Sequence, residues 1–437
     1  MRIALNALLR TIFVLSGAVL LVDVAFFGPG IAFPGVPFSI RRALFLIAIA
    51  AALGLRCLAR RSFTRPEIGL LSAILLLVVG WVLVIPRVGG YSMGHAIADA
   101  SPWTALVLVA VWPWPDWDRR LDWAKTRKLV LALGLVLACV HVLIWALLIT
   151  NTVSRTEFYV AAEVLLGSDQ QGDPYIRIAE VPTGFRIFWS SSIFLLGCVY
   201  FLVAYPPRSR RVLWWFMLLL ICFAMWATQI RAFLAALFIG GAAWPCVRLL
   251  GRYGLLSRPR AQVMLFWIAG VLLVSIAINP AVLQATGFAR EGDADAEREE
   301  QAQPLLDQFL EQPVLGSGFG SYTPRVVRSD EFPFSYELTF YALLMKLGIG
   351  GMAVLVAALL LALKCIRADL AARSKPRVFA LWVAFTTGLW FSGATNPMVT
   401  SFVGMAVLVL VFIDLRQQLP QDSDRIVQQG PSGRAGG

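Results

Sequence analysis

The chain has 437 residues, of which 59% are hydrophobic and only 15% charged, whereas soluble domains carry roughly 25% charged residues. This composition predicts a membrane protein and excludes a peripheral enzyme or a large soluble domain. The formal net charge is +12. The basic residues gather in alternate loops, however, and this distribution sets membrane orientation and argues against a nucleic-acid partner.

Apolar stretches long enough to cross a hydrocarbon core of about 30 Å as helices recur along the chain. We expect about twelve membrane-spanning helices, centred on residues 11–27, 43–59, 68–86, 98–114, 129–149, 187–205, 212–229, 232–250, 263–281, 338–363, 378–394 and 397–415. The expected fold is therefore an all-α polytopic membrane protein. A single transmembrane domain would cover residues 1–415, and residues 416–437 would form a polar, disordered cytoplasmic tail.

Twelve spans place both termini on one side of the membrane. The loops on that side are rich in Lys and Arg, so the positive-inside rule makes it the cytoplasm. Arg41 and Arg42 are the exception, since they fall on the opposite side. Acidic residues gather instead in two long outer loops, about 150–186 and 282–337, which have room for an outward-facing site.

Metal and disulfide chemistry find little support in the sequence. The six cysteines lie in apolar segments or at their basic ends, and His95 and His141 cannot by themselves supply a three-histidine zinc site. Asp293 and Asp295 form an Asp-x-Asp pair like that of nucleotide-sugar transferases, but nucleotide sugars are cytoplasmic and this loop is expected outside. We therefore expect no metal and no cofactor.

Two arginines of the expected outer side stand out. Arg231 lies in the short hairpin between the seventh and eighth spans, with no acidic residue within thirty positions. It is either an anchor that reaches the lipid headgroups or a cation that faces an anion at the membrane surface. Arg298 lies within an acidic run in the second long loop and can pair with Asp295 three residues earlier on a helix.

The residues after Arg298 predict a short surface helix and a glycine turn. Pro304 can open an amphipathic helix that carries Leu305, Leu306, Phe309 and Leu310 on one face, and Pro313 closes it. The run Gly316-Ser317-Gly318-Phe319-Gly320 follows. It lacks the strand and helix of a dinucleotide site, but a tight turn there can bring N–H groups near a phosphate.

Glu337 is expected to open the tenth span, where the helix dipole stabilises a carboxylate. A carboxylate at the apolar boundary also suits a general base. Lys346, nine residues later, would lie on the opposite face of the same helix and is no obvious partner.

Residues 298–320 and 337–351 resemble the second long periplasmic loop of bacterial O-antigen ligases and polymerases. In that family an arginine precedes a Pro-x-x-Gly-x-Gly turn by about fifteen residues, as Arg298 precedes Pro313. The hairpin at 228–232 also resembles the family's arginine-containing hairpin. The resemblance implies a type C glycosyltransferase fold in the bacterial inner membrane, with both termini cytoplasmic and the active site facing the periplasm.

The resemblance further implies transfer of a glycan from undecaprenyl pyrophosphate to an acceptor hydroxyl. Arg231 and Arg298 would hold the pyrophosphate and Glu337 would act as the base. Further substrate contacts would come from Arg186, Gly316 and Gly318. Implied partners are the lipid-linked glycan, an acceptor glycan or lipid, membrane lipids and a chain-length regulator.

Three functions remain open at this point. The ligases carry His-Asn where this chain has Glu337-Leu338, and this difference favours a polymerase of O-antigen or exopolysaccharide repeat units. An O-antigen ligase that attaches glycan to the lipid A core of lipopolysaccharide is the alternative. A lipid-linked glycan transporter or flippase is the alternative from another class, and Asp23 and Lys346 would be its intramembrane charges.

Overall fold

The protein is a helical bundle in the computed structural model, which describes residues 2–27, 40–112, 123–166, 176–181, 184–206, 211–228, 236–241, 243–245, 293–327, 332–368, 374–394, 400–419 and single positions between them. Within these residues, five helices are long and apolar enough to cross a membrane. They run over Ile3–Phe26, Arg65–Val88, Met93–Val111, Trp123–Ile149 and Thr339–Cys365. The chain is therefore a helical membrane protein.

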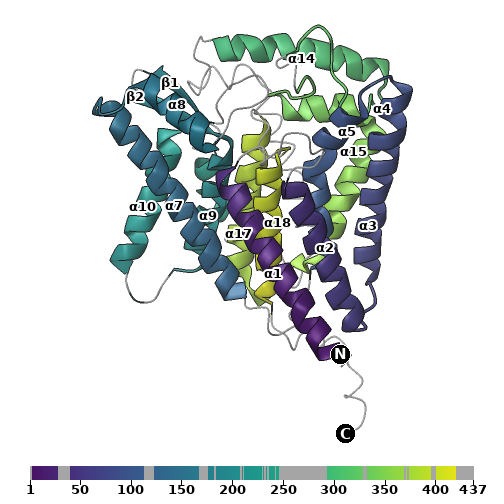
Figure 1. The fold of residues 1–437 in the computed structure, drawn as a ribbon. Coiled ribbons are helices and arrows are strands. Elements are labelled where there is room, and N and C mark those ends of the chain that lie inside the picture. Colours follow the sequence, from purple (N-terminus) through teal and green to yellow (C-terminus); the bar gives the residue numbers. More distant parts are fainter. Residues whose placement is uncertain are drawn as a thin grey trace.

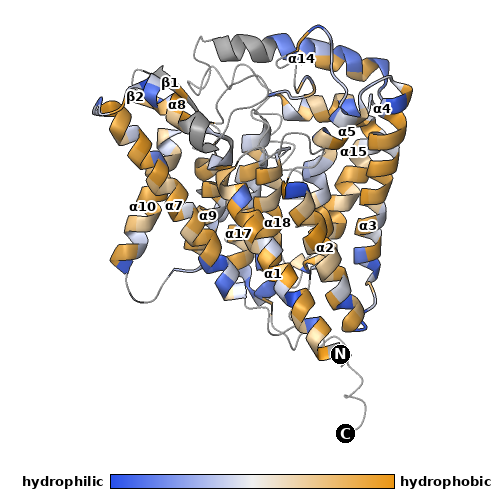
Figure 2. Cartoon of the chain, in the orientation of Figure 1, coloured by the Kyte–Doolittle hydropathy of each residue, from blue (hydrophilic) through white to orange (hydrophobic). Residues whose placement is uncertain are grey.

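The long helices lie side by side (Figure 1). Apolar residues form the middle of the bundle and hydrophilic residues gather at its ends (Figure 2). The main helices are α1 (Arg2–Phe26), α2 (Ile40–Leu58), α7 (Trp123–Ile149), α9 (Ile193–Ala204), α10 (Arg211–Ala227), α15 (Thr339–Cys365), α17 (Pro376–Ala394) and α18 (Phe402–Gln417). Each coincides with an expected span, whereas the span at 263–281 lies outside the described residues.

Two of the expected spans are built from several helical pieces. The span at 68–86 consists of α3 (Arg65–Leu77), the π-helix η1 (Val78–Val84) and α4 (Ile85–Val88). The span at 98–114 consists of α5 (Met93–Ala100), the 3₁₀-helix η2 (Ser101–Leu106) and α6 (Val107–Val111). Such π and 3₁₀ segments redirect side chains within a helix, and η1 points Trp81 into the site described below.

The first long loop contains a helix and, within its described residues, a β-hairpin that the prediction of helices alone did not include. After α8 (Arg155–Leu166), strands β1 (Ile176–Val181) and β2 (Gly184–Trp189) pair antiparallel, with Ala179 opposite Arg186. Residues 187–189 therefore belong to a strand and not to the sixth span, which begins at Ile193. The reason is a period-two pattern that buries alternate residues of both strands, namely Ile176, Ile178, Ile187 and Trp189.

Helix α14 (Asp293–Glu311) is longer than the sequence indicated. It begins eleven residues before Pro304, which lies inside the helix and does not open it. Acidic residues at a helix start complement the dipole. The hydrogen bond that proline cannot make concerns only the carbonyl of Glu300, which is exposed to water. Leu305 is fully buried, whereas Leu310 is exposed, so the helix lies across one end of the bundle (Figure 1).

Buried ion pairs lie inside the described part of the bundle. Arg41 forms an ion pair with Asp23, and its Nη2 also donates to the carbonyl of Phe27 at 3.0 Å. This pairing explains why an arginine occurs at the end of a helix where the positive-inside rule does not expect one, because Arg41 in the first turn of α2 is held by Asp23 of α1. Arg56 and Glu67 form a second buried pair, with Nη2 2.6 Å from Oε2.

Candidate functional site

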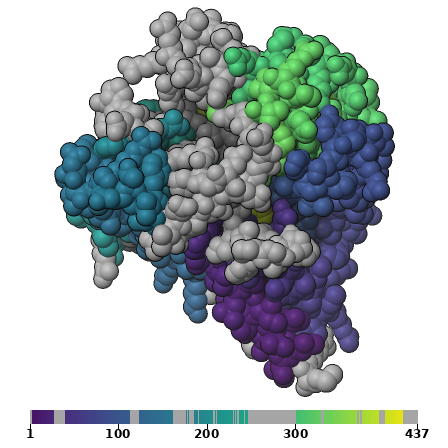
Figure 3. Space-filling view, turned by 45° about the horizontal axis from the view of Figure 1, so that its top comes forward, coloured from purple at the N-terminus to yellow at the C-terminus, as the bar shows by residue number. Residues whose placement is uncertain are grey.

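The site occupies the end of the bundle where α14 lies. Here α5, the loop at 312–338 and the start of α15 meet, and Figure 3 shows α14 and the following residues packed against α3 to α5. It contains the second long loop, with the described candidates Glu337, Gly316 and Gly318.

The glycine run is folded into the protein interior, and its backbone N–H groups have protein acceptors. Gly316 donates to the carbonyl of Gln312 at 2.8 Å and Gly318 donates to that of Lys346 at 2.8 Å. The three other N–H groups of the run, from Ser317, Phe319 and Gly320, donate to Met345, Trp81 and the Asp99 carboxylate. All five donors are therefore engaged, and this removes the basis for assigning Gly316 and Gly318 to phosphate binding through the backbone.

The glycine run can pack against α15 because that helix is interrupted at Gly348, opposite the run. Gly348 has φ +59° and ψ −173° inside α15, so the helix kinks there. The N–H groups after the kink turn outward, and Ile349 and Gly350 donate to the carbonyls of Pro313 and Val314 at 2.8 Å each. The loop and the interrupted helix thus form hydrogen bonds with each other's backbone N–H and C=O groups, which need partners when they are buried.

The Trp81 side chain of the π-helix η1 binds both the glycine-containing loop and α15. Its indole N–H is 2.7 Å from the carbonyl of Leu315 in the loop and 2.9 Å from that of Leu347 in α15. The ring is 7% exposed. One side chain therefore contacts both the loop and α15, each more than 200 residues further along the chain.

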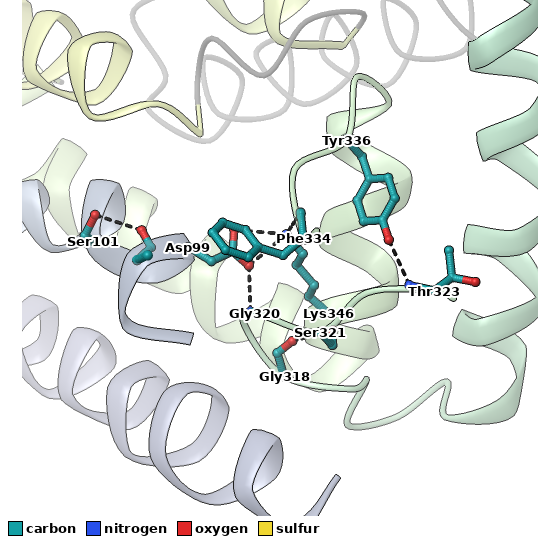
Figure 4. A network of polar contacts seen from close by, with 10 residues as sticks. Asp99, Ser101, Gly318, Gly320, Ser321, Thr323, Phe334, Tyr336 and Lys346 are labelled. Atoms are coloured by element: carbon teal, nitrogen blue, oxygen red, sulfur yellow. Dashed lines mark hydrogen bonds and ion pairs between the residues drawn. The ribbon is translucent and has the colours of Figure 1, made fainter. Parts of the chain in front are cut away.

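An ion pair between Lys346 and Asp99 lies at the centre of the site (Figure 4). The Lys346 Nζ is 2.7 and 2.9 Å from the two Asp99 oxygens and 2.8 Å from the carbonyl of Phe334. Asp99 also accepts the N–H of Gly320 at 2.8 Å. The side chains of Lys346 and Asp99 are only 6% and 10% exposed, so the pair has the additional hydrogen bonds that a buried pair needs.

Glu337 follows this network closely in the chain but does not open α15. The helix begins at Thr339, whose N–H donates to the carbonyl of Glu337 at 2.9 Å. The N–H of Glu337 in turn donates to the side-chain oxygen of Gln301 in α14 at 3.1 Å. Glu337 is half-buried. Glu337 thus lies two residues before the start of α15, the end at which the helix dipole is positive.

The structure describes the three candidate arginines to different extents. Arg298 lies on α14, one turn before Gln301, and its side chain is outside the described residues. Arg231 is also outside them, although Thr228, Ile230 and Phe233 beside it are buried. Arg186 lies on β2, which packs against α7 and α10. The hairpin and α15 occupy opposite sides of the same end of the bundle (Figure 1).

The site also contains polar residues that the sequence did not single out. Tyr336 accepts the N–H of Thr323 at 2.8 Å, and burial raises the pKa of its hydroxyl to about 12. Tyr91 accepts a hydrogen bond from Gln308 of α14 at 3.1 Å, and burial raises the pKa of Tyr91 as well. Nothing in local spacing marks these tyrosines, because their partners come from distant segments.

The described residues contain no group of three or more His, Cys, Asp or Glu side chains placed to hold a metal ion. The Asp293 and Asp295 side chains lie outside the described residues. A comparison with known protein families and with curated proteins finds no match for this chain.

Proposed function

We propose that this chain is a metal-independent glycosyltransferase of the bacterial inner membrane that polymerises lipid-linked polysaccharide repeat units on the periplasmic side. One observation carries the proposal: the backbone of Glu337 is hydrogen-bonded to Gln301, one helical turn after Arg298. A candidate base and a candidate phosphate-binding arginine, 39 positions apart in sequence numbering, therefore belong to adjoining segments. The resemblance in the sequence motifs supplies the reaction class.

In the proposed reaction, the oxygen of an acceptor hydroxyl attacks the anomeric carbon of the donor glycan. The bond from that carbon to the pyrophosphate oxygen breaks, and undecaprenyl pyrophosphate leaves with the bonding electrons. Glu337 takes the proton of the attacking hydroxyl. Arg298 and Arg231 stabilise the negative charge on the leaving pyrophosphate, since planar guanidinium groups bind phosphate oxygens in pairs. Arg186 is proposed to contact the glycan.

The rigid surroundings of Glu337 support this role. Lys346 donates a hydrogen bond to the carbonyl of Phe334, three residues before Glu337. The side-chain oxygen of Gln301 accepts the N–H of Glu337 itself. A base must keep its geometry to within a fraction of an ångström to be effective, and hydrogen bonds to buried neighbours provide that restraint.

The charges of the transporter hypothesis have a structural role. Asp23 pairs with Arg41, and Lys346 pairs with Asp99. Charges that move with a substrate or coupling ion are expected to lie along a pathway at broken helices. Lys346 does lie two residues before the break in α15, but its contacts with Asp99 and the Phe334 carbonyl hold it in place. Fixed pairs of this kind agree better with an enzyme.

The test is the glycan made by a strain in which the variant is the only copy of the protein. Glu337→Gln keeps size but cannot accept a proton, so we expect a rate loss on the order of 10²-fold or more. Glu311→Gln, at the exposed end of α14, is the matched control and should behave as wild type. Glu337→His should retain part of the activity, because imidazole can also accept the proton.

Arginine variants test the pyrophosphate contact. Arg298→Lys and Arg231→Lys keep the charge but lose the planar donor pair, so both should depress activity strongly at equal protein abundance. Arg325→Lys is the control, since Arg325 is 71% exposed and only pairs with Asp307 at the surface. Glycans collapsed to a single repeat unit would support the polymerase. Long glycans missing only from the lipopolysaccharide core would point to the ligase, and wild-type ladders from Glu337→Gln would refute the base.

A further inference from the structure

Gln301 on α14 is fully buried, with 0% of its surface exposed, yet only one of its two side-chain polar atoms has a partner. Its oxygen Oε1 accepts the N–H of Glu337 at 3.1 Å. Its nitrogen Nε2 is buried and has no hydrogen-bond partner in the part of the chain that the structure describes. The protein therefore uses the acceptor of this amide and leaves its two donors unused.

The contact with Glu337 fixes the orientation of the amide. A backbone N–H can only donate, so the atom that faces it must be the amide oxygen, which accepts. The opposite orientation would place donors against each other. The NH₂ group is bonded to the same carbon as the oxygen, and it therefore lies close to the backbone of the candidate base with both N–H bonds available.

An NH₂ group without a partner in the interior is costly. Water hydrogen-bonds this group in the unfolded chain, so burial without a replacement lowers the free energy of unfolding. Methionine would fill a similar space without this cost. Buried polar groups have partners in the great majority of cases, and an exception calls for an acceptor from outside the chain. The amide thus indicates an acceptor that arrives with a ligand.

The packing of α14 gives a ligand a way to reach the amide. Leu305, one turn after Gln301, belongs to a small hydrophobic cluster with Tyr336, Ala342 and Met345, which is separate from the main core of the bundle. A contact with few buried apolar side chains opens more easily than a core does. A small displacement of α14 against α15 therefore exposes Gln301 without unfolding the bundle.

The surroundings of Gln301 indicate the chemistry of the ligand. Arg298, proposed above to bind the donor's pyrophosphate, precedes it by one turn of α14. Pyrophosphate oxygens accept hydrogen bonds, and an NH₂ group offers two donors and no acceptor. A hydrogen bond to a charged oxygen is stronger than one to a neutral group, and more so in a site shielded from water. We propose that the Gln301 amide donates to an oxygen of the donor's pyrophosphate, an inference that rests on the proposed function.

The experiment measures the binding of undecaprenyl pyrophosphate, without a glycan, to the full-length protein in nanodiscs. Gln301→Met keeps the length and helix propensity of the side chain but removes both donors. We expect it to bind this lipid roughly tenfold or more weakly than wild type, the loss typical of a hydrogen bond to a charged group. It should melt at or above the temperature of wild type, because removal of the unpartnered NH₂ group offsets the lost hydrogen bond to Glu337.

Two controls accompany this variant. Gln303→Met removes an exposed amide of the same helix, which donates to Asp307, and should bind undecaprenyl pyrophosphate like wild type. Undecaprenol has the same hydrocarbon chain but no phosphate, and it should bind equally to wild type and Gln301→Met. Weaker binding of undecaprenol by Gln301→Met would show that the substitution disturbs packing, and it would overturn the proposal.

A second variant separates the donor from the positioning of Glu337. Gln301→Glu keeps an oxygen for the Glu337 N–H but replaces the NH₂ group by an oxygen that repels phosphate. If Gln301 only positioned Glu337, this variant would bind undecaprenyl pyrophosphate like wild type, whereas we expect at least the loss seen for Gln301→Met. Wild-type affinity in either folded variant would overturn this proposal alone. Absence of binding by wild type would refute the proposed function, and this inference with it.

Discussion

Replacement of Lys346 by methionine tests whether the buried ion pair determines the structure of the site. The substitution keeps most of the side-chain volume and removes the ammonium group. The Asp99 carboxylate, 2.7 Å away and 10% exposed, would then be left without its cation, and the Phe334 carbonyl would lose its donor. Breaking a buried pair from one side costs about 3–5 kcal/mol, and we expect a loss of unfolding free energy in this range.

A double-mutant cycle separates the pair from the packing of each residue. Asp99→Asn keeps an acceptor for the Gly320 N–H but leaves the Lys346 ammonium without its anion. The double variant Lys346→Met with Asp99→Asn contains no buried charge. Its loss of stability should therefore be smaller than the sum of the two single losses, by about 2 kcal/mol or more.

The assay is unfolding in mixed detergent micelles, followed by the fluorescence of the 15 tryptophans. A surface pair provides the comparison: Arg325 and Asp307 are 3.2 Å apart with side chains 71% and 38% exposed. Arg325→Met should cost only about 0–1 kcal/mol. Additive effects of Lys346→Met and Asp99→Asn, or a Lys346→Met loss no larger than that of Arg325→Met, would refute the reasoning.

Three further predictions follow from the same end of the molecule and from the topology. Gly318→Ala should lower the unfolding free energy by about 2–5 kcal/mol in the same assay, because its φ is +85° and its Cβ would lie 2.6 Å from Pro86. Gly90→Ala is the control. Its φ is +76° and a Cβ there meets no atom within 4 Å, so it should lose only about 1–2 kcal/mol, the cost of the left-handed backbone conformation. Between pH 10 and 12 the unfolding free energy of wild type should fall by up to roughly 3 kcal/mol relative to that of Tyr336→Phe. Burial raises the pKa of Tyr336 to about 12, so in this range only the unfolded state releases the proton. Parallel curves of unfolding free energy against pH for the two proteins would contradict this. Cysteine labelling from outside should modify residues in 150–186 and 282–337 and leave 251–262 unmodified, and labelling of position 298 from the cytoplasm would exclude a periplasmic reaction.

The sequence determined the membrane character and the positions of most helices, because both depend on local composition. An apolar stretch of about twenty residues can satisfy its backbone groups in lipid only as a helix, and α1, α7, α15 and α18 lie where such stretches occur. The hairpin β1–β2 was missed because its alternating apolar residues adjoin the apolar stretch of α9, so the two patterns merged into one expected span.

The start of α14 was misjudged for a different reason. Pro304 is a strong local sign of a helix start, but a helix tolerates a proline when water can bind the carbonyl that it leaves free, here that of the exposed Glu300. Similarly, the sequence predicts Glu337 in the first turn of α15, whereas the helix begins two residues later, because Leu338 before it has the non-helical angles φ −77° and ψ 71°.

The contacts of the glycine run and of the lone charges depend on distant segments of the chain, which local spacing does not reveal. The spacing of Gly316, Gly318 and Gly320 suggested phosphate binding, yet their N–H groups point to Gln312, Lys346 and Asp99. The partner of Lys346 is 247 positions away in the chain. A local pattern shows which residues can form a tight turn or carry a charge. Their hydrogen-bond and ion-pair partners come from distant segments, which meet only when the chain packs and excludes water.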